Sequence, residues 1–295
     1  MPLFAIMDNE SAIKIVRIKL DKDASEMIDQ TFGDQKLHFE AHHDSVIPFY
    51  AGYSPSYNEC FELDNFADAE SLADTITRNT AIPEWDPKEI DIDHIKALFV
   101  GVGKPKSKDC IAIQTFNKKQ ILDTSKSFVM SIVGAANTFS KAEKVGFNID
   151  DKLVAIIKNG KIYFRSFFKL RSIFNMNVYF QEATDNDLAV FSSNTAFIVP
   201  PGFDLSVIAD TPIRNKITMI NKSGILEAEL LPTLKAAANK IGFPLKTQVT
   251  QGQEKIEMPQ TKKEIKALLD FLDEDIFTSE ISQKIFKSNS KRPYN

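Results

Sequence analysis

The residues with the clearest chemical potential are a glycine pair beside lysines, four histidines, and acidic residues close to lysines. Gly101 and Gly103, followed by Lys104, suggest a phosphate-binding loop. A Walker loop, however, separates its glycines by four residues, so that backbone N–H groups can wrap the phosphates. Here the glycines are two positions apart, and Pro105 removes one N–H donor. We therefore interpret residues 103–108 as the basic tip of a hairpin.

The histidines can bind a metal ion only if their side chains converge. His38 and His42 have the His-x3-His spacing that places two ligands on one face of a helix. Residues 36–41 read as a strand, however, along which these histidines lie too far apart. Cys60 and Cys110 have no partner cysteine close in the sequence. No metal site and no cofactor are expected.

Catalytic constellations find no positive support in the sequence. A nuclease needs carboxylates that converge on Mg²⁺, commonly with a lysine nearby. Asp86-Pro87-Lys88 lies in a proline-bounded loop, and Glu264-Ile265-Lys266 lies on a helical segment, where residues i and i+2 diverge. No Gly-x-Ser-x-Gly elbow occurs, and neither cysteine has the context of a nucleophile. We predict a protein without a catalytic centre, and keep a divergent metal-dependent nuclease as an alternative.

Basic residues interleaved with aromatic residues form the remaining signal, between residues 158 and 171. Lys and Arg that reach phosphates give an affinity that depends on salt and not on base sequence. Tyr163, Phe164 and Phe167 are expected to be core residues and not platforms for stacked bases, since the chain has 23 phenylalanines to bury. The candidate phosphate contacts are Lys104, Lys106, Lys108, Lys118, Lys119, Lys158, Lys161, Arg165, Lys169 and Arg171.

Composition limits the class of protein. The chain has 295 residues, of which 43% are hydrophobic and 26% charged, as in globular proteins. Two cysteines cannot build a disulfide framework, which favours the reducing cytoplasm. The sequence has no secretory signal pattern, and its apolar stretches fall short of the roughly 20 residues of a membrane span. We expect a cytoplasmic protein that does not itself span a membrane.

The net charge of −4 hides an asymmetry. Residues 1–100 carry 8 Lys and Arg against 20 Asp and Glu, whereas residues 101–295 carry 28 against 20. The excess is greatest in residues 101–181, with 14 basic and 5 acidic residues. Such a distribution can steer a polyanion to one face of a protein. The simpler interpretation is that two solvated surfaces differ in the sign of their net charge.

Hydrophobic periodicity places these residues in an α+β fold, with a mixed, largely antiparallel sheet in the middle of the chain and helices concentrated in the C-terminal third. Two hairpins are expected, one pairing residues 95–102 with 109–116, and one pairing 153–157 with 161–167 around Asn159-Gly160. The strands expected elsewhere are 13–20, 36–41, 46–50, 60–63 and 284–287. The expected helices are 24–32, 68–78, 184–191, 213–221, 234–241 and 261–273.

The division between domains is expected near residues 81–92, where two prolines and several acids interrupt the periodicity. This interruption coincides with the change of charge sign. It separates an acidic α+β region, 1–91, from an α+β domain with a basic surface, 92–295.

Four segments, in this order, carry a family resemblance: residues 113–122 (IQTFNKKQIL), 161–167 (KIYFRSF), 183–191 (ATDNDLAVF) and 286–293 (FKSNSKRP). They resemble the KwaB family of the Kiwa anti-phage defence system and the wider domain family to which it belongs. The resemblance is good over residues 92–295 and loose over 11–91.

The resemblance implies a homodimeric effector that binds double-stranded DNA, has no established catalytic centre, and acts with KwaA, a multi-pass membrane protein. Such a partner would recruit the chain to the inner face of the membrane. The last segment adds Lys287, Lys291 and Arg292 as candidate DNA contacts, although these residues could equally anchor the C-terminal tail. The alternative to DNA binding is a structural scaffold of a membrane-associated defence complex, whose basic face meets the partner or anionic lipid.

Overall fold

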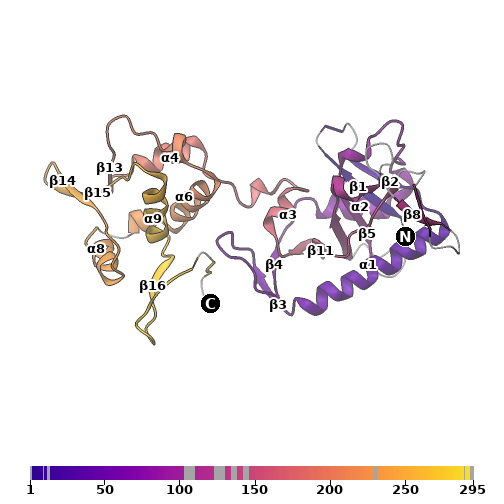
Figure 1. Cartoon of the computed structure of the whole chain (residues 1–295), viewed down its shortest axis with the longest axis horizontal. Helices are drawn as coiled ribbons and strands as arrows, with labels where there is room; N and C mark the ends of the chain where they lie inside the picture. The colour runs from indigo at the N-terminus through magenta and orange to yellow at the C-terminus, as the bar shows by residue number, and fades with distance from the viewer. Residues whose placement is uncertain are drawn as a thin grey trace. The chain divides into compact units, whose positions relative to one another are not determined.

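The computed structural model describes residues 2–8, 10–11, 14–102, 110–122, 130–133, 138–141, 146–228, 231–288 and 290–292. The chain forms two compact units (Figure 1). Unit 1 comprises Met1–Phe49 and Pro55–Asn175, and unit 2 comprises Tyr50–Ser54 and Met176–Asn295. No helix in these described ranges is both long and apolar enough to cross a membrane.

An eight-stranded sheet forms the centre of unit 1. Adjacent strands in this sheet run antiparallel, except for β3 and β4, which are parallel. Its strands, in spatial order, are β2 (Ile15–Ile18), β1 (Leu3–Met7), β5 (Ile95–Gly101), β6 (Cys110–Thr115), β11 (Ala155–Lys158), β12 (Lys161–Phe164), β4 (Glu59–Leu63) and β3 (Ser45–Pro48). The expected α+β class and antiparallel sheet are confirmed. The expected division at 91/92 runs through this sheet, because β1 pairs with β5 and β4 pairs with β12. The compact units divide after Asn175 instead.

Both expected hairpins are present. β5 pairs with β6, and β11 pairs with β12 through Lys158 opposite Lys161. Asn159 and Gly160 connect the second pair with φ angles of 51° and 75°. Positive φ at both central residues is the condition of a type I′ turn, whose twist matches that of paired strands. The Asn-Gly dipeptide therefore sets the register that orients Lys158 and Lys161.

The helix α1 (Lys22–His42) replaces the expected helix 24–32 and strand 36–41. The strand prediction was wrong because residues 36–41 alternate by chance, while the buried residues Ile28, Phe32 and Phe39 follow helical spacing. Asp21 caps the helix by accepting a hydrogen bond from the Ala24 N–H at 2.8 Å. As a result, the His38 and His42 rings stack one turn apart, with centroids at 3.9 Å.

The two faces of the sheet are covered by different helices. Ile28 and Phe32 of α1 pack on a core that includes Leu98 and Val100. Side chains alternate along a strand, so Gly101 belongs to the other face. There α2 (Ala69–Thr77) approaches so closely that a Cβ on Gly101 would lie 2.9 Å from Cγ2 of Ile76. The sheet is thus enclosed on both faces, as its almost wholly apolar central strands require.

Short elements complete unit 1. They are η1 (Asn79–Ala81), η2 (Ile92–His94), η3 (Lys118–Gln120), α3 (Phe167–Arg171), the pair β7 (Ile121–Leu122) with β10 (Gly146–Phe147), and the pair β8 (Met130–Val133) with β9 (Thr138–Lys141).

Unit 2 is mainly helical around one apolar core that α4, α6 and α9 share. Its elements are η4 (Met176–Val178), α4 (Asp185–Ser192), α5 (Leu205–Ile208), α6 (Thr211–Ser223), α7 (Ile225–Ala228), α8 (Leu231–Lys240), α9 (Lys262–Leu272), a sheet of β13 (Phe197–Ile198), β15 (Gln253–Glu257) and β14 (Thr247–Thr250), and the hairpin β16 (Ile276–Thr278) with β17 (Ile285–Lys287). The helices and the strand expected in this region are confirmed, with ends shifted by a few residues.

A cluster of charges fixes the C-terminal segment to unit 2. Asp275 is only 1% exposed. One of its carboxylate oxygens accepts a hydrogen bond from Lys216 of α6, and the other accepts one from Lys291 at 2.8 Å. Ser290 continues the attachment, since its hydroxyl accepts a hydrogen bond from the Ser54 N–H at 2.9 Å. The segment Tyr50–Ser54, which interrupts unit 1 in the sequence, is thereby held within unit 2.

Replacing Asp275 with Ala is expected to destabilise unit 2, because Lys216 and Lys291 lose their buried partner and keep only Asp273. Breaking a fully buried pair costs about 3–5 kcal/mol, and partial exposure of both lysines reduces the expected loss to about 2 kcal/mol. Urea unfolding followed by circular dichroism measures it. The matched control is Lys235→Ala, which breaks an exposed pair with Glu254 and should cost less than about 1 kcal/mol. Equal losses for both variants would contradict the prediction.

Candidate nucleic-acid interface

Lys161 projects from β12 but is neutralised by the neighbouring strand. β12 pairs with β4, which places Glu62 and Asp64 beside Lys161. The Lys161 Nζ lies 2.8 Å from a carboxylate oxygen of each acid. The hydrogen bonds to Asp64 and Glu62 raise the pKa of Lys161, with burial opposing them weakly. Lys161 is therefore permanently charged, and two acids compete with any phosphate for it.

Lys158 is also paired with an acid of the N-terminal third. Glu40 of α1 accepts hydrogen bonds from Lys158 and, at 2.7 Å, from Lys36. Burial opposes ionisation of Glu40, but the bonds from Lys158 and Lys36 outweigh it and lower the pKa of this carboxyl. The sheet thus brings acids of residues 1–100 against bases of residues 101–181.

The lysines of η3 are more accessible. Lys118 is largely exposed and lies 3.2 Å from Asp93, while Lys119 is exposed and makes no ion pair with any described residue. Asn117 and Gln120 form a capping box that fixes this turn. Lys104, Lys106 and Lys108 lie outside the described residues.

Arg165 follows β12 and lies against an exposed ring. Its Nη2 donates a hydrogen bond to the Ser56 carbonyl at 3.0 Å, and its guanidinium carbon lies 5.8 Å from the centroid of the Tyr57 ring. The Tyr57 side chain is 71% exposed. Its ring also meets the His42 ring edge-on at 5.9 Å. These contacts join three segments that are far apart in the sequence.

The helix α3 has a buried side and an exposed side. Ser166 caps it, accepting a hydrogen bond from the Lys169 N–H at 3.3 Å. Phe167 stacks on Phe49 at 5.0 Å, and Leu170 is fully buried. The opposite side presents Lys169, which is exposed, and Phe168, which is 82% exposed, and Arg171 at the end of the helix is exposed as well. We call Tyr57, Arg165, Phe168, Lys169 and Arg171 the α3 surface.

The sequence prediction was correct for the core rings, since Phe164 is fully buried and Tyr163 and Phe167 are partly buried. It missed Phe168 and Tyr57 as exposed rings. One sequence signal marks the region: residues 152–181 contain six Lys and Arg and no Asp or Glu. No comparable signal marks Tyr57, because it reaches Arg165 only through the pairing of β4 with β12.

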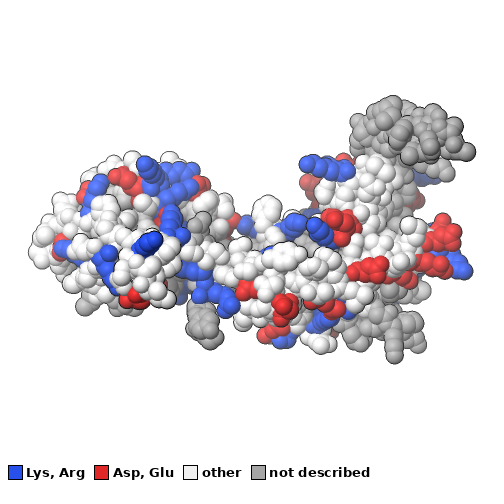
Figure 2. Space-filling view, turned by 60° about the horizontal axis from the view of Figure 1, so that its bottom comes forward, with Lys and Arg blue, Asp and Glu red and all other residues white. Residues whose placement is uncertain are grey.

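The three C-terminal candidates are engaged within unit 2. Lys287 lies 2.5 Å from Asp270, Lys291 bonds Asp275, and the Arg292 guanidinium lies 5.5 Å from the Tyr53 ring. These contacts favour an anchoring role for the tail. On the face drawn in Figure 2, Lys and Arg side chains and Asp and Glu side chains both occur.

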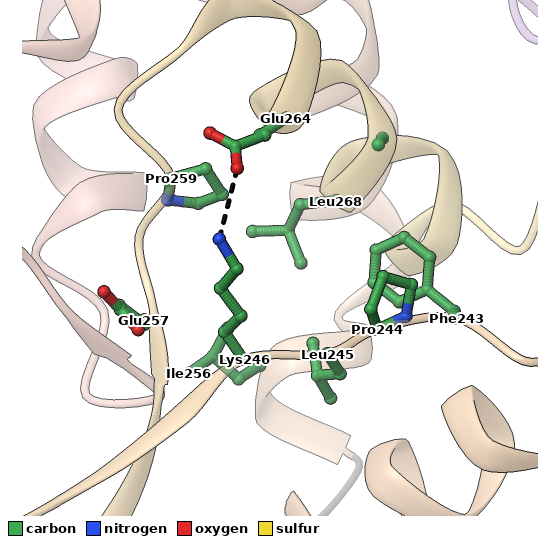
Figure 3. Close-up of a pocket in the computed structure, with 10 residues that line it drawn as sticks. Phe243, Pro244, Leu245, Lys246, Ile256, Glu257, Pro259, Glu264 and Leu268 are labelled. Carbon is green, nitrogen blue, oxygen red and sulfur yellow. Dashed lines mark hydrogen bonds and ion pairs between the residues drawn. The ribbon is translucent and has the colours of Figure 1, made fainter.

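Two further features could bind small ligands. Asp8, Glu10 and His94 bring ligand atoms within 4.8 Å of one another, but both Asp8 oxygens are occupied, one by His94 and one by the N–H groups of Glu10 and Ser11. In unit 2, a small cavity of about 100 Å³ lies between α9, β15 and the segment 243–246. The Lys246–Glu264 ion pair, at 3.2 Å, spans this cavity, and most of its other walls are apolar (Figure 3).

Neither cysteine has the environment of a nucleophile. Cys60 and Cys110 are buried, and burial raises the pKa of each thiol to about 11. Both are therefore protonated at neutral pH, whereas the thiolate is the reactive form.

The family model described as "Kiwa protein KwaB-like" matches residues 93–282, more than half of the 295 residues. The chain therefore belongs to the KwaB-like family of Kiwa proteins, which confirms the resemblance predicted from four motifs, and the family's context is anti-phage defence. No curated protein and no solved structure matches the chain.

The His94–Asp8 pair should make stability depend on pH. The hydrogen bond between His94 and Asp8 raises the pKa of His94 above 6.5 and lowers the pKa of Asp8 below 3.8. The stabilising contribution of His94 to the free energy of unfolding is complete below the pKa of the unfolded histidine, and it is lost as pH rises through the raised pKa of the folded state. The contribution of Asp8 is lost as pH falls through its lowered pKa in the folded state. Urea midpoints of the native chain and His94→Gln should therefore differ more at pH 5.5 than at pH 8.5. An equal difference at both pH values would contradict this.

Proposed function

We propose that this chain is a non-enzymatic effector of anti-phage defence that binds double-stranded DNA without sequence preference and acts with a membrane protein of the KwaA type. The observation that carries the proposal is the α3 surface, where Lys169 and Arg171 are exposed in a stretch of thirty residues without an acid. Phosphates are the ligands that such a surface recognises, because Lys and Arg contact them irrespective of base sequence. Lys118 and Lys119 offer further contacts in the same unit.

The absence of catalysis is part of the proposal. Among the described residues, the one cluster with metal-ligand geometry is Asp8, Glu10 and His94, and the internal hydrogen bonds already account for its arrangement. Incubating supercoiled and linear DNA with the protein and Mg²⁺ or Mn²⁺ tests this part. Intact DNA is expected, and cleavage that disappears on His94→Ala would establish the nuclease alternative.

A scaffold role is the second candidate, favoured by a different surface. The hairpin of β16 and β17 exposes Phe277, Ile281, Ile285 and Phe286, with the two Phe rings stacked at 6.0 Å. Exposed apolar side chains gathered on one element are typical of protein contacts. A membrane partner or a second copy in a homodimer would both suit this hairpin. Co-purification with the membrane partner, lost on Phe286→Ser but retained by α3-surface variants, would support the scaffold.

DNA binding should weaken steeply with salt, and the slope should report which cations touch phosphate. Each lost contact lowers the slope of log K against log salt by about 0.9 for duplex DNA. Lys169→Ala with Arg171→Ala is expected to lower it by about 2. The matched control is Lys161→Ala, which removes a lysine held by two acids and should leave the slope within about 0.5 of the native value.

Gel shifts of long duplex DNA between low and high salt provide the measurement. No binding at low salt would refute the proposed function. If Lys161→Ala lowered the slope as much as Lys169→Ala with Arg171→Ala, phosphates would have to displace Glu62 and Asp64 from Lys161. That result would contradict a site in which Lys161 is neutralised and Lys169 and Arg171 bind DNA.

A further inference from the structure

The exposure of Phe168 is maintained by the packing of its neighbours. Phe167 and Leu170 point into unit 1 from the same short helix, so Phe168 and Lys169 must point outward. A helix of five residues has little stability of its own and depends on this packing. An apolar ring at 82% exposure has lost most of the free energy that burial would supply. A binding partner that covers this ring would recover it.

A second exposed ring, Tyr57, lies beside Arg165. Arg165 contacts Tyr57 and precedes Phe168 by three residues, so the Cα atoms of Arg165 and Phe168 are at most about 11 Å apart. Arg165 is held by the Ser56 carbonyl, and the Ser56 N–H in turn donates a hydrogen bond to Glu59 at 2.8 Å. Glu59 thus helps to fix the loop that carries Tyr57.

Rings interspersed with cations form the surface that unpaired bases recognise. Each base has an aromatic face that stacks on Tyr or Phe, and the backbone follows nearby Lys and Arg. A duplex hides those faces, and exposing one costs unpairing and unstacking energy. A protein surface would also cover apolar rings, but Arg165 beside Tyr57 and Lys169 next to Phe168 in the sequence add the positive charge that a phosphate backbone requires.

We propose that Tyr57 and Phe168 stack on bases of single-stranded DNA, while Arg165 and Lys169 contact its phosphates. This proposal rests on the proposed function and narrows it: the α3 surface prefers single-stranded segments, such as displaced strands or frayed ends, and duplex DNA contacts its cations alone. The preference should be independent of base identity, because stacking is.

Fluorescence anisotropy with a labelled 20-nucleotide oligo-dT and a 20-base-pair duplex tests the proposal. Phe168→Ala should weaken oligo-dT binding about tenfold, within the range for one stacked base, and leave duplex binding within about twofold. Tyr57→Ala should act in the same direction, and Phe168→Trp should retain affinity. The matched control is Val207→Ala, which removes an apolar side chain of the same 82% exposure from unit 2 and should change neither.

Phe168→Trp also gives a direct signal, because stacking on a base should quench the new indole relative to the single native tryptophan, Trp85. Native-like oligo-dT affinity of Phe168→Ala and Tyr57→Ala, or an unquenched indole in Phe168→Trp, would overturn the stacking proposal while duplex binding stands. Loss of membrane-partner binding by these variants, with oligo-dT affinity unchanged, would assign the rings to a protein contact and overturn it as well. Failure to bind either DNA at low salt would refute DNA binding itself.

Discussion

The pairing of β12 with β4 is the constraint on which the rest of unit 1 depends. It brings the loop before β4 beside the residue after β12, and so joins Tyr57 to Arg165. It also sets Glu62 and Asp64 against Lys161. One antiparallel register therefore decides both which cation is neutralised and which ring lies beside an arginine. On the other side of β12, the turn at Asn159-Gly160 fixes the separate register of β12 with β11.

The charge asymmetry of the sequence is largely cancelled by this fold. Acids of the first hundred residues meet bases of the middle region at Glu40–Lys158, Glu62–Lys161 and Asp93–Lys118. Acidic and basic residues that are separated in the sequence thus lie next to each other in the fold. The charge totals of the two parts of the sequence therefore do not imply one acidic face and one basic face that would steer a polyanion. Lys169 and Arg171 remain exposed on α3, which follows the sheet in a stretch of sequence, residues 152–181, that contains no acidic residue.

Local signals were sufficient for much of the fold. The Asn-Gly dipeptide and the apolar runs located both hairpins, and helical spacing located α6, α8 and α9. The end of α1 was misjudged because residues 36–41 alternate, while the spacing of Phe32 and Phe39 that makes the segment helical spans a longer window. The boundary between units and the pairing of Tyr57 with Arg165 depend on contacts between residues more than a hundred positions apart, which no local pattern encodes.

The family match begins at residue 93, within unit 1 and not at its edge. Residues 93–282 alone would leave β5 without β1 and β12 without β4, so two central strands would become exposed edges. Residues before the match are therefore a structural part of the same unit, although they resemble the family only loosely. They also carry Tyr57 and the acids that neutralise Lys158 and Lys161. Variation in this first part can therefore change the α3 surface through Tyr57, and the availability of Lys158 and Lys161 through their acidic partners, without altering the matched region.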